Sequence, residues 1–260
     1  MRQLVASNWY LEWEIHRNNP GLLGDIAAVL GMLTINIQTI NGVEPCKRGM
    51  LIQTDDDEKI NLLKSVLDAL EDITVTALRK STVMDTLAVR HGKYSVQDTR
   101  EEKIFRFARD EIGLLVEFMG EIFKKNGHQL IGVRGMPRVG KTEAMIAASV
   151  SANKRWTLVS STLLRQTARN QLAMNEWAGE SVYIIDGVVS TLRGTNKHRK
   201  LMEKVLALEA TKVIEHPDIF ARETGGSLAD FDYIIELRNH PDEEITYEVV
   251  NASISNFDIT

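Results

Sequence analysis

Eight residues near the middle of the chain have the types and spacing of a phosphate-binding loop. Residues 135–142 read GMPRVGKT and fit the pattern G-x-x-x-x-G-K-[ST] at every fixed position. Glycines let such a backbone approach phosphates closely, successive N–H groups attract the anion, the lysine neutralises outer charge, and the hydroxyl can ligate Mg²⁺. The pattern predicts phosphate contacts from Gly135, Met136, Pro137, Arg138, Val139, Gly140, Lys141, Thr142 and Glu143.

The residues on either side of the loop support this prediction. An apolar run over 130–133 precedes it and a helix-prone run over 143–148 follows it, which is the strand–loop–helix setting that the pattern requires. The segment resembles the Walker A loop of the P-loop NTPase superfamily. This resemblance implies that ATP or GTP binds together with Mg²⁺, with Thr142 as a metal ligand. The alternative is a glycine-rich turn that binds nothing.

A carboxylate at the end of another apolar run is the second chemical feature. Asp186 ends the run 182–186, which resembles a Walker B strand. The resemblance implies that Asp186 ligates Mg²⁺ and acts beside Lys141 in catalysis. Asp186 comes two predicted strands after the loop strand. That spacing resembles the kinase–GTPase division of the superfamily, in which the Walker B strand lies beside the loop strand, and the run Ile-Ile-Asp-Gly resembles nucleotide monophosphate kinases.

Two departures count against a kinase. Small-molecule kinases often carry a carboxylate after the second strand, where this chain has the hydroxyl residues 160–162. These hydroxyls can bind a substrate or, as we favour, cap the next helix. No glutamate follows Asp186, so the catalytic glutamate of many ATPases is missing at that place.

Cations follow Asp186 in the sequence. Phosphoryl transfer needs positive charge near the transferred group, so we expect Arg193 to act as a catalytic lid residue. Arg222, shortly before the pair Gly225-Gly226, is a second candidate. A solvated helix face is the alternative for the stretch that contains Arg193, Lys197, His198, Arg199 and Lys200.

The elements around the loop predict an α/β domain over 127–260. Strands are expected at 128–133, 155–160, 181–186, 212–215, 231–237 and 245–250, and helices at 141–152, 163–178 and 195–210. Strands that alternate with helices imply right-handed crossovers and a mainly parallel sheet covered by helices.

The first 80 residues predict a separate, smaller domain. Alternating apolar residues indicate strands at 9–16, 36–43, 47–53 and 73–78, and residues at helical spacing indicate one helix after the first strand and one before the last. The resulting order is βαββαβ, the ferredoxin-like arrangement.

This first domain resembles the ACT family of small ligand-binding domains. The resemblance rests on residues 18–30, which read NNPGLLGDIAAVL, and on Ile-Asn-Ile at 35–37. It implies an amino-acid effector held between paired domains, and hence a homodimer. Effector contacts are expected from Asn18, Gly21, Leu22 and Asn36. The alternative is that Pro20-Gly21 makes only a tight turn and that the domain only pairs.

Residues 81–126 are expected to form a linker and a long amphipathic helix. Apolar residues recur at spacings of three and four from Ile104 to Ile122, after a plausible helix start at Asp98. The helix either packs simply on its neighbours or acts as a lever that couples the two domains.

Composition limits the class of protein. The chain has 260 residues, is 43% hydrophobic and has a formal net charge of -5. It therefore has enough apolar residues for a core, and its acidic balance makes nucleic acid an unlikely partner. No segment predicts a membrane span or an export signal, and Cys46 is the single cysteine. We expect a cytoplasmic protein without disulfides.

Together these features predict an ATP- and Mg²⁺-binding P-loop protein regulated by an ACT domain. The combination resembles a group of bacterial proteins that join these two domains. The expected reaction is phosphoryl transfer, to water or to a small acceptor. The competing hypothesis is a non-catalytic switch, in which nucleotide orders loops and exposes a surface for a protein partner.

Overall fold

The chain folds into two compact units. The structure is a computed structural model that describes residues 7–94, 96–97, 103–162, 167–177, 179–243 and 245. The units are residues 1–95, called here the N-terminal domain, and residues 96–260, called the C-terminal domain. The predicted linker at 81–126 is therefore not a separate segment, because its two parts belong to different domains.

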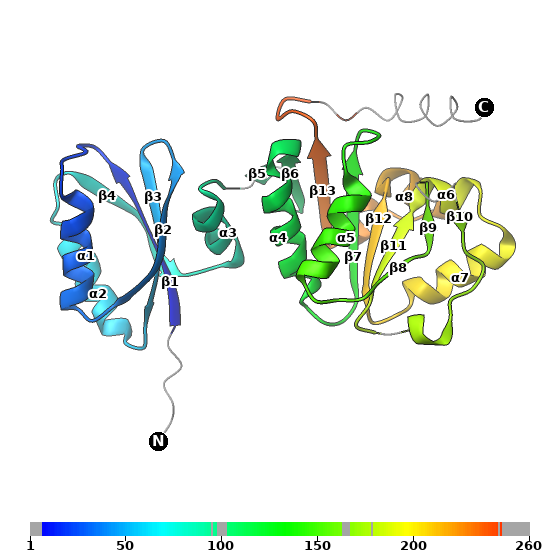
Figure 1. Ribbon diagram of the computed structural model, residues 1–260, viewed down its shortest axis with the longest axis horizontal. Coiled ribbons are helices and arrows are strands. Elements are labelled where there is room, and N and C mark those ends of the chain that lie inside the picture. The colour runs from blue at the N-terminus through cyan, green and yellow to red at the C-terminus, as the bar shows by residue number, and fades with distance from the viewer. Residues whose placement is uncertain are drawn as a thin grey trace, which may run out of the picture. The chain divides into compact units, whose positions relative to one another are not determined.

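The N-terminal domain has the predicted βαββαβ order (Figure 1). Its four strands form an antiparallel sheet in the order β2-β3-β1-β4. A further helix, α3, follows the last strand and was not predicted. The elements are β1 (Ser7–Ile15), α1 (Leu22–Met32), β2 (Asn36–Glu44), β3 (Lys47–Thr54), α2 (Asp57–Leu67), β4 (Ile73–Lys80) and α3 (Val83–His91).

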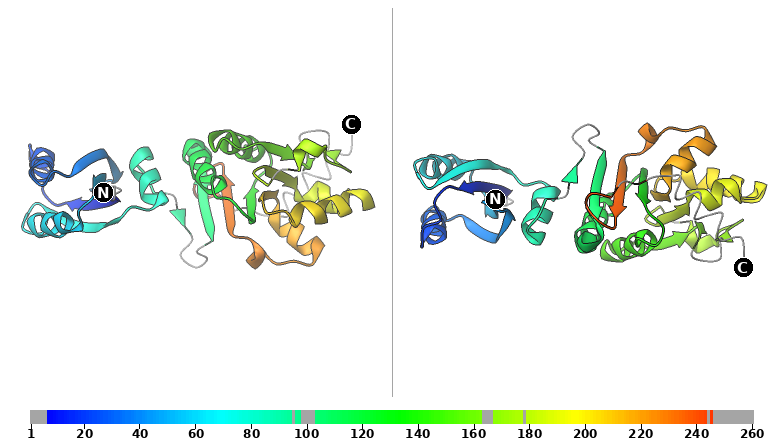
Figure 2. Two further views of the ribbon diagram at one scale, coloured as in Figure 1. Left: turned by 90° about the horizontal axis from the view of Figure 1, so that it is seen from below. Right: turned by 90° about the horizontal axis from the view of Figure 1, so that it is seen from above.

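Helices cover both faces of this sheet (Figures 1 and 2). Side chains alternate along a strand, so Leu11 and Trp13 of β1 face α1 and α2 in one apolar cluster. Tyr10 of the same strand lies in a second cluster, with Ala88 and Val89 of α3. The capping box of Thr82 and Asp85 begins α3, and Gly92 in a left-handed conformation ends it.

The C-terminal domain is an α/β domain built on a seven-stranded sheet. The strand order is β5-β6-β13-β7-β12-β11-β8. The six strands from β6 to β8 are parallel to their neighbours, and β5 pairs antiparallel with β6. Its strands are β5 (Val96–Gln97), β6 (Ile104–Ala108), β7 (Gln129–Gly135), β8 (Trp156–Leu158), β9 (Ser160–Ser161), β10 (Thr167–Ala168), β11 (Val182–Asp186), β12 (Thr211–Glu215) and β13 (Tyr233–Arg238).

Helices cover both faces of the large sheet as well. In Figure 2, α4 and α5 lie on one face and α8 lies on the other. On the face of α8, buried residues of α7 and α8 pack with Tyr183 and Ile185 of β11 in one apolar cluster. The α-helices are α4 (Ile112–Phe123), α5 (Lys141–Ser151), α6 (Gly187–Leu192), α7 (Asn196–Leu206) and α8 (Pro217–Thr224), and short 3₁₀ turns are η1 (Arg109–Glu111), η2 (Met174–Glu176) and η3 (Leu228–Asp230).

Three predicted elements are wrong or lie outside the described residues. The expected long helix over 101–125 is instead strand β6, the turn η1 and helix α4, because Ile104–Ala108 pairs with β13 inside the sheet. The part of the expected helix 163–178 that is described contains β10 and η2 and no α-helix. Of the expected strand 245–250, the structure describes residue 245 alone.

None of the helices in the described parts of the chain is long and apolar enough to span a bilayer. Cys46 is a free, exposed cysteine.

Candidate functional site

The phosphate-loop segment has the predicted strand before it and the predicted helix after it. Strand β7 ends at Gly135, and α5 begins at Lys141. Gly140 has φ +105° at the N-cap of α5, a conformation that favours glycine. Arg138 has φ +65°, which is uncommon for a residue with a Cβ. The loop therefore turns sharply and leaves the first N–H groups of α5 without helical partners, as an anion site requires.

Gly135 is needed because another strand lies against it. A Cβ added at this position would lie 2.5 Å from the carbonyl oxygen of Leu237 in β13. Val139 is buried and anchors the far side of the loop, whereas Met136 and Pro137 are half-buried and Arg138 is exposed. The start of the loop thus packs directly against the backbone of β13.

Lys141 folds back over the loop. Its Nζ donates hydrogen bonds to the carbonyl oxygens of Gly135, at 2.9 Å, and Met136, at 3.0 Å. The residue is only 6% exposed, and burial lowers the pKa of its ammonium, against the attraction of the Glu215 and Asp186 carboxylates. Among the described residues, no carboxylate lies within ion-pair distance of Lys141. A buried cation held by carbonyls alone is suited to accept an anionic ligand.

Thr142 meets a carboxylate that the sequence prediction did not select. Its hydroxyl donates a short hydrogen bond to the carboxylate of Glu215. Glu215 ends β12, and β12 lies directly beside the loop strand β7. Burial, followed by the nearby Asp186 carboxylate, raises the pKa of Glu215 to about 7. The sequence signal that could have found Glu215 is a second predicted strand that ends in a carboxylate. The sequence analysis predicted that strand but assigned Glu215 no role.

Asp186 lies at the predicted strand end but one strand further from the loop. The expectation that its strand adjoins the loop strand is wrong, because β12 lies between β7 and β11. Asp186 and Glu215 are register partners in the adjacent strands. Both carboxylates therefore lie at the carboxyl edge of the sheet, on the same side as the loop.

The Asp186 carboxylate is already engaged within the protein. One oxygen accepts from the backbone N–H of Val189 at 3.0 Å, which caps α6, and the other accepts from the backbone N–H and the hydroxyl of Thr162. Ser160 bonds the backbone of Asp186 and the hydroxyl of Ser190. The hydroxyls of Ser160 and Thr162 thus hold the Asp186 strand end, whereas residues 163–166, where the expected helix would begin, lie outside the described residues.

His216 lies at the same edge. It has φ +55° between β12 and α8, and its backbone N–H donates to Val133 of β7. Burial, followed by the charge of Lys141, lowers the pKa of His216 to about 4. The imidazole is therefore neutral around pH 7, and the sequence prediction had not selected it.

The predicted lid cations lie away from this cluster. Arg193 is exposed at the C-terminal end of α6, about 10 Å along the helix axis from Asp186. Arg222 forms a surface ion pair with Glu223, and Gly225 ends α8 in a left-handed conformation. His198 is fully buried and bonds Ser190 and the carbonyl oxygen of Arg169, so it is not part of a cationic surface.

The predicted effector residues fall at two ends of the N-terminal domain. Gly21 has φ +97° at the N-cap of α1, Asn18 is exposed in the same loop, and Leu22 is buried beneath them. Asn36 begins β2 and shares the β3 partner Gln53 with Asn8 of β1. Because the loop follows Ile15, seven residues further along β1, about 23 Å of strand separates Asn36 from it. One chain does not bring Asn36 to the other three residues.

Within the described residues, no group of three or more His, Cys, Asp or Glu side chains is arranged to hold a metal ion by itself. A metal at this edge would need ligands from a bound phosphate as well.

Comparison with known proteins gives the family of the chain. Residues 75–258 match the family described as "Protein of unknown function (DUF3388)". The chain belongs to this family. It is 58% identical over 245 residues to the "Uncharacterized protein YmfK" of Bacillus subtilis (strain 168), which covers 94% of this chain and 91% of the relative. The phosphate loop and both carboxylates lie inside the part that matches the DUF3388 family.

The solved structures include phospho-2-dehydro-3-deoxyheptonate aldolase (DAHP synthase) from Thermotoga maritima. It is 9% identical, with 97% of each chain covered and a TM-score of 0.22.

Proposed function

We propose that this protein binds a nucleoside triphosphate with Mg²⁺ at the loop 135–142. The observation that carries the proposal is Lys141, a buried ammonium at the N-terminus of α5 whose hydrogen-bond partners among the described residues are two loop carbonyls. Moving Nζ from these carbonyls to a phosphate would replace neutral acceptors by a charged one, which makes stronger hydrogen bonds. The N–H groups of the loop and helix would supply the remaining contacts.

The oxygen ligands beside the loop fit Mg²⁺. Thr142 and Glu215 lie in hydrogen-bond contact, Asp186 is the register partner of Glu215, and Mg²⁺ prefers such hard oxygen donors together with phosphate. We therefore assign Thr142 and Glu215 as the residues that would hold the ion, with Asp186 acting through the charge it adds. A bound Mg²⁺ would neutralise phosphate charge, and it would stabilise the ionised form of Glu215.

For the N-terminal domain we propose an ACT-like regulatory role. Its βαββαβ order and the exposed glycine turn at Gly21 support a site for an amino-acid carboxylate at the start of α1. Since Asn36 lies at the far end of the sheet, Asn18 and Gly21 are the contacts from one chain. A second copy would have to supply Asn36, which links the effector proposal to a homodimer. We place this regulated protein in the cytoplasm.

Nucleotide titration of the full chain tests the proposal. Fluorescent analogues of ATP and GTP are added to the wild-type protein and to Lys141→Ala, with Mg²⁺ or with EDTA. We expect saturable binding to the wild type and at least about tenfold weaker binding to Lys141→Ala, because a charge-assisted hydrogen bond is lost. Lys204→Ala, an exposed lysine of α7, is the matched control and should keep wild-type affinity.

Circular dichroism of each variant first establishes that it folds. Wild-type affinity in folded Lys141→Ala, or no binding of either nucleotide to the wild type, would refute the proposal.

A non-catalytic switch is the second candidate function, and the state of Asp186 favours it. Both oxygens of this carboxylate accept hydrogen bonds from the protein, so it is poorly placed to activate water. Phosphate release from ATP and GTP, measured with and without small acceptors, separates the two functions. Release that Lys141→Ala abolishes supports an enzyme, whereas tight binding without release supports the switch.

A further inference from the structure

A pocket with several polar side chains in its lining opens at the edge of the large sheet opposite the phosphate loop. Trp156 and Val182 are the first residues of the parallel strands β8 and β11, so this is the amino edge of the sheet. The loop, Asp186 and Glu215 all follow strand ends at the carboxyl edge. The pocket has a volume of about 440 Å³ and is lined by Lys154, Arg155, Trp156, Thr157, Asn175, Glu176 and Ser181.

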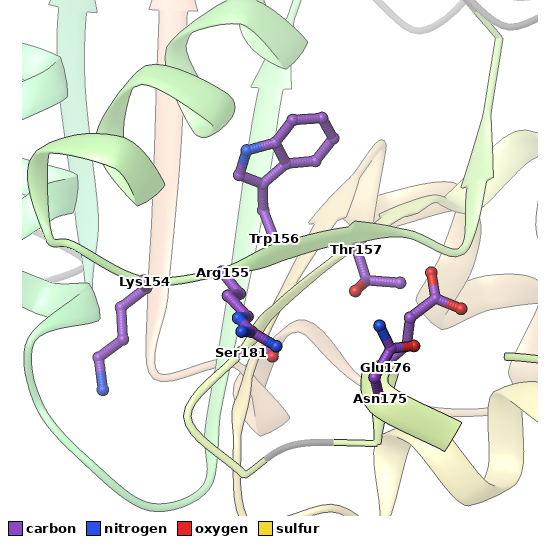
Figure 3. Close-up of a pocket in the computed structure, with 7 residues that line it drawn as sticks. All are labelled: Lys154, Arg155, Trp156, Thr157, Asn175, Glu176 and Ser181. Carbon is purple, nitrogen blue, oxygen red and sulfur yellow. The ribbon is translucent and has the colours of Figure 1, made fainter. Parts of the chain in front are cut away.

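Four polar side chains of the lining point toward one another. Figure 3 shows Arg155, Thr157, Asn175 and Ser181 on one side of the β8 strand, with the Trp156 ring directed to the other side. Residues 155 and 157 share a side because side chains alternate along a strand. The interior of the pocket therefore presents several hydrogen-bonding groups on one side of β8.

Two hydroxyl groups of the lining make no hydrogen bond to the described residues. Thr157 is 6% exposed and Ser181 is 2% exposed, and among the described residues neither hydroxyl makes a hydrogen bond. The guanidinium of Arg155 and the carboxamide of Asn175 likewise have no side-chain partner in the described part of the chain. Neither hydroxyl oxygen is among the buried atoms without a partner, so both are open to solvent and to a group bound in the pocket.

The charge of the lining favours an anion. Glu176 is neutralised by a two-point ion pair with Arg169, with N–O distances of 2.7 and 2.6 Å. Lys154 bonds the uncharged side-chain oxygen of Asn126, and Arg155 has no carboxylate partner among the described residues. The positive charges of Lys154 and Arg155 therefore remain uncompensated at the pocket.

The wall that carries Asn175 is firmly held. The Arg169–Glu176 ion pair fixes the turn η2. In addition, the backbone N–H of Ala173 donates a hydrogen bond to the Glu176 carboxylate, and the hydroxyl of buried Tyr183 donates one to the Glu176 carbonyl oxygen at 2.6 Å. The pocket is thus preformed, and its volume lies in the range of sites for small molecules.

We propose that this pocket binds a small metabolite through a carboxylate or phosphate group. Arg155 would pair with the anion, and the hydroxyls of Thr157 and Ser181 and the amide of Asn175 would donate hydrogen bonds to its oxygens. The site is separate from the nucleotide site and does not depend on it.

Inorganic phosphate and succinate are the probes, used in two arms. Because phosphate would also occupy the proposed nucleotide site, both are titrated into ¹⁵N-labelled full-length Lys141→Ala. We expect saturable shifts of the backbone amides of 154–157 and 175–177. Shifts with succinate alone identify a carboxylate ligand, shifts with phosphate alone a phosphate ester, and shifts with both support the shared chemistry.

Variants of the pocket give the decisive comparison. In the same background, Arg155→Ala should weaken binding about tenfold or more, Ser181→Ala should weaken it several-fold, and Lys197→Ala on α7 should leave it unchanged. The proposal is overturned if neither probe shifts these amides, if the shifts do not saturate, or if Arg155→Ala binds as tightly as its parent.

Discussion

The hydroxyl of Thr142 at the end of the phosphate loop donates a hydrogen bond to the carboxylate of Glu215, 73 residues later in the chain. The contact exists because β12 lies between the loop strand and the strand of Asp186. It makes Glu215, and not Asp186, the carboxylate in contact with the loop.

The first prediction concerns the stability of Glu215→Gln. The pKa of Glu215 is raised to about 7, so its contribution to stability is greatest at low pH and is lost as pH rises from about 4.5 to about 7. Glutamine keeps an oxygen for Thr142 and carries no charge. We expect the variant to gain stability relative to wild type across that interval, by at most about 3 kcal/mol. Urea unfolding at pH 5 and pH 8 measures the difference in unfolding free energy between the variant and the wild type. A difference that does not grow with pH would contradict the prediction.

The same substitution tests the metal assignment. Losing a charged oxygen ligand should weaken the Mg²⁺-dependent part of nucleotide binding at least about tenfold, while binding in EDTA changes little. The measurement is the titration with fluorescent nucleotide at increasing Mg²⁺. Glu203→Gln, at an exposed position of α7, is the control. Equal Mg²⁺ dependence in Glu215→Gln and wild type would remove Glu215 from the proposed site.

Gly135→Ala should destabilise the C-terminal domain. The new methyl group would lie 2.5 Å from the Leu237 carbonyl oxygen, which is part of the backbone of β13 and cannot move aside. We expect a loss of about 2 kcal/mol, or roughly 4–8 °C in the melting temperature of this domain. In Gly226→Ala the methyl group would make an ordinary contact at 3.4 Å, so that variant should stay within about 0.5 kcal/mol of wild type. Equal melting of the two variants by calorimetry would contradict this prediction.

Arg134→Leu tests the ion-pair network behind the loop. Arg134 bonds both oxygens of Asp218 in α8 and one of Glu236 in β13, and its side chain is 13% exposed. Removing it takes a two-point ion pair from Asp218 and one cationic partner from Glu236, and we expect a loss of about 3 kcal/mol by urea unfolding. Arg222→Leu breaks an exposed pair with Glu223 on the same helix and should cost no more than about 0.5 kcal/mol. Similar losses would show that burial of the network is unimportant.

Glu12→Gln tests the hydrogen-bonded cluster of Glu12 with Tyr10, Thr76 and Tyr94. Burial tends to raise the pKa of Glu12, but hydrogen bonds from Thr76, Tyr10 and Tyr94 lower it overall. The ionised group therefore stabilises the N-terminal domain above pH 4.5, and this stabilisation is lost as pH falls below that value.

For Glu12→Gln we accordingly expect a loss of about 1–3 kcal/mol at pH 7 and a smaller loss near pH 4. Thermal unfolding at the two pH values measures it. Glu14→Gln on the same strand is the control, because the structure gives Glu14 no side-chain hydrogen bond among the described residues. A loss of stability that grows as pH falls would contradict the assignment of Glu12 as ionised.

Local patterns determined the loop and the small domain. The spacing of Gly135, Gly140 and Lys141 predicts a turn between a strand and a helix. This prediction needs no tertiary contact, because glycine readily adopts the backbone angles that such a turn requires. Alternation and helical spacing likewise gave the βαββαβ order, since each element has one buried face.

Tertiary structure alone decided the rest. Apart from Arg106, Ile104–Ala108 is apolar and buried, so its sequence fits a buried strand or a helix, and pairing with β13 selects the strand. Strand order is also invisible in the sequence, because it depends on which edges pair across long crossovers. It is this order that brings Glu215 to Thr142, moves Asp186 one strand away and carries Asn36 to the far end of its sheet.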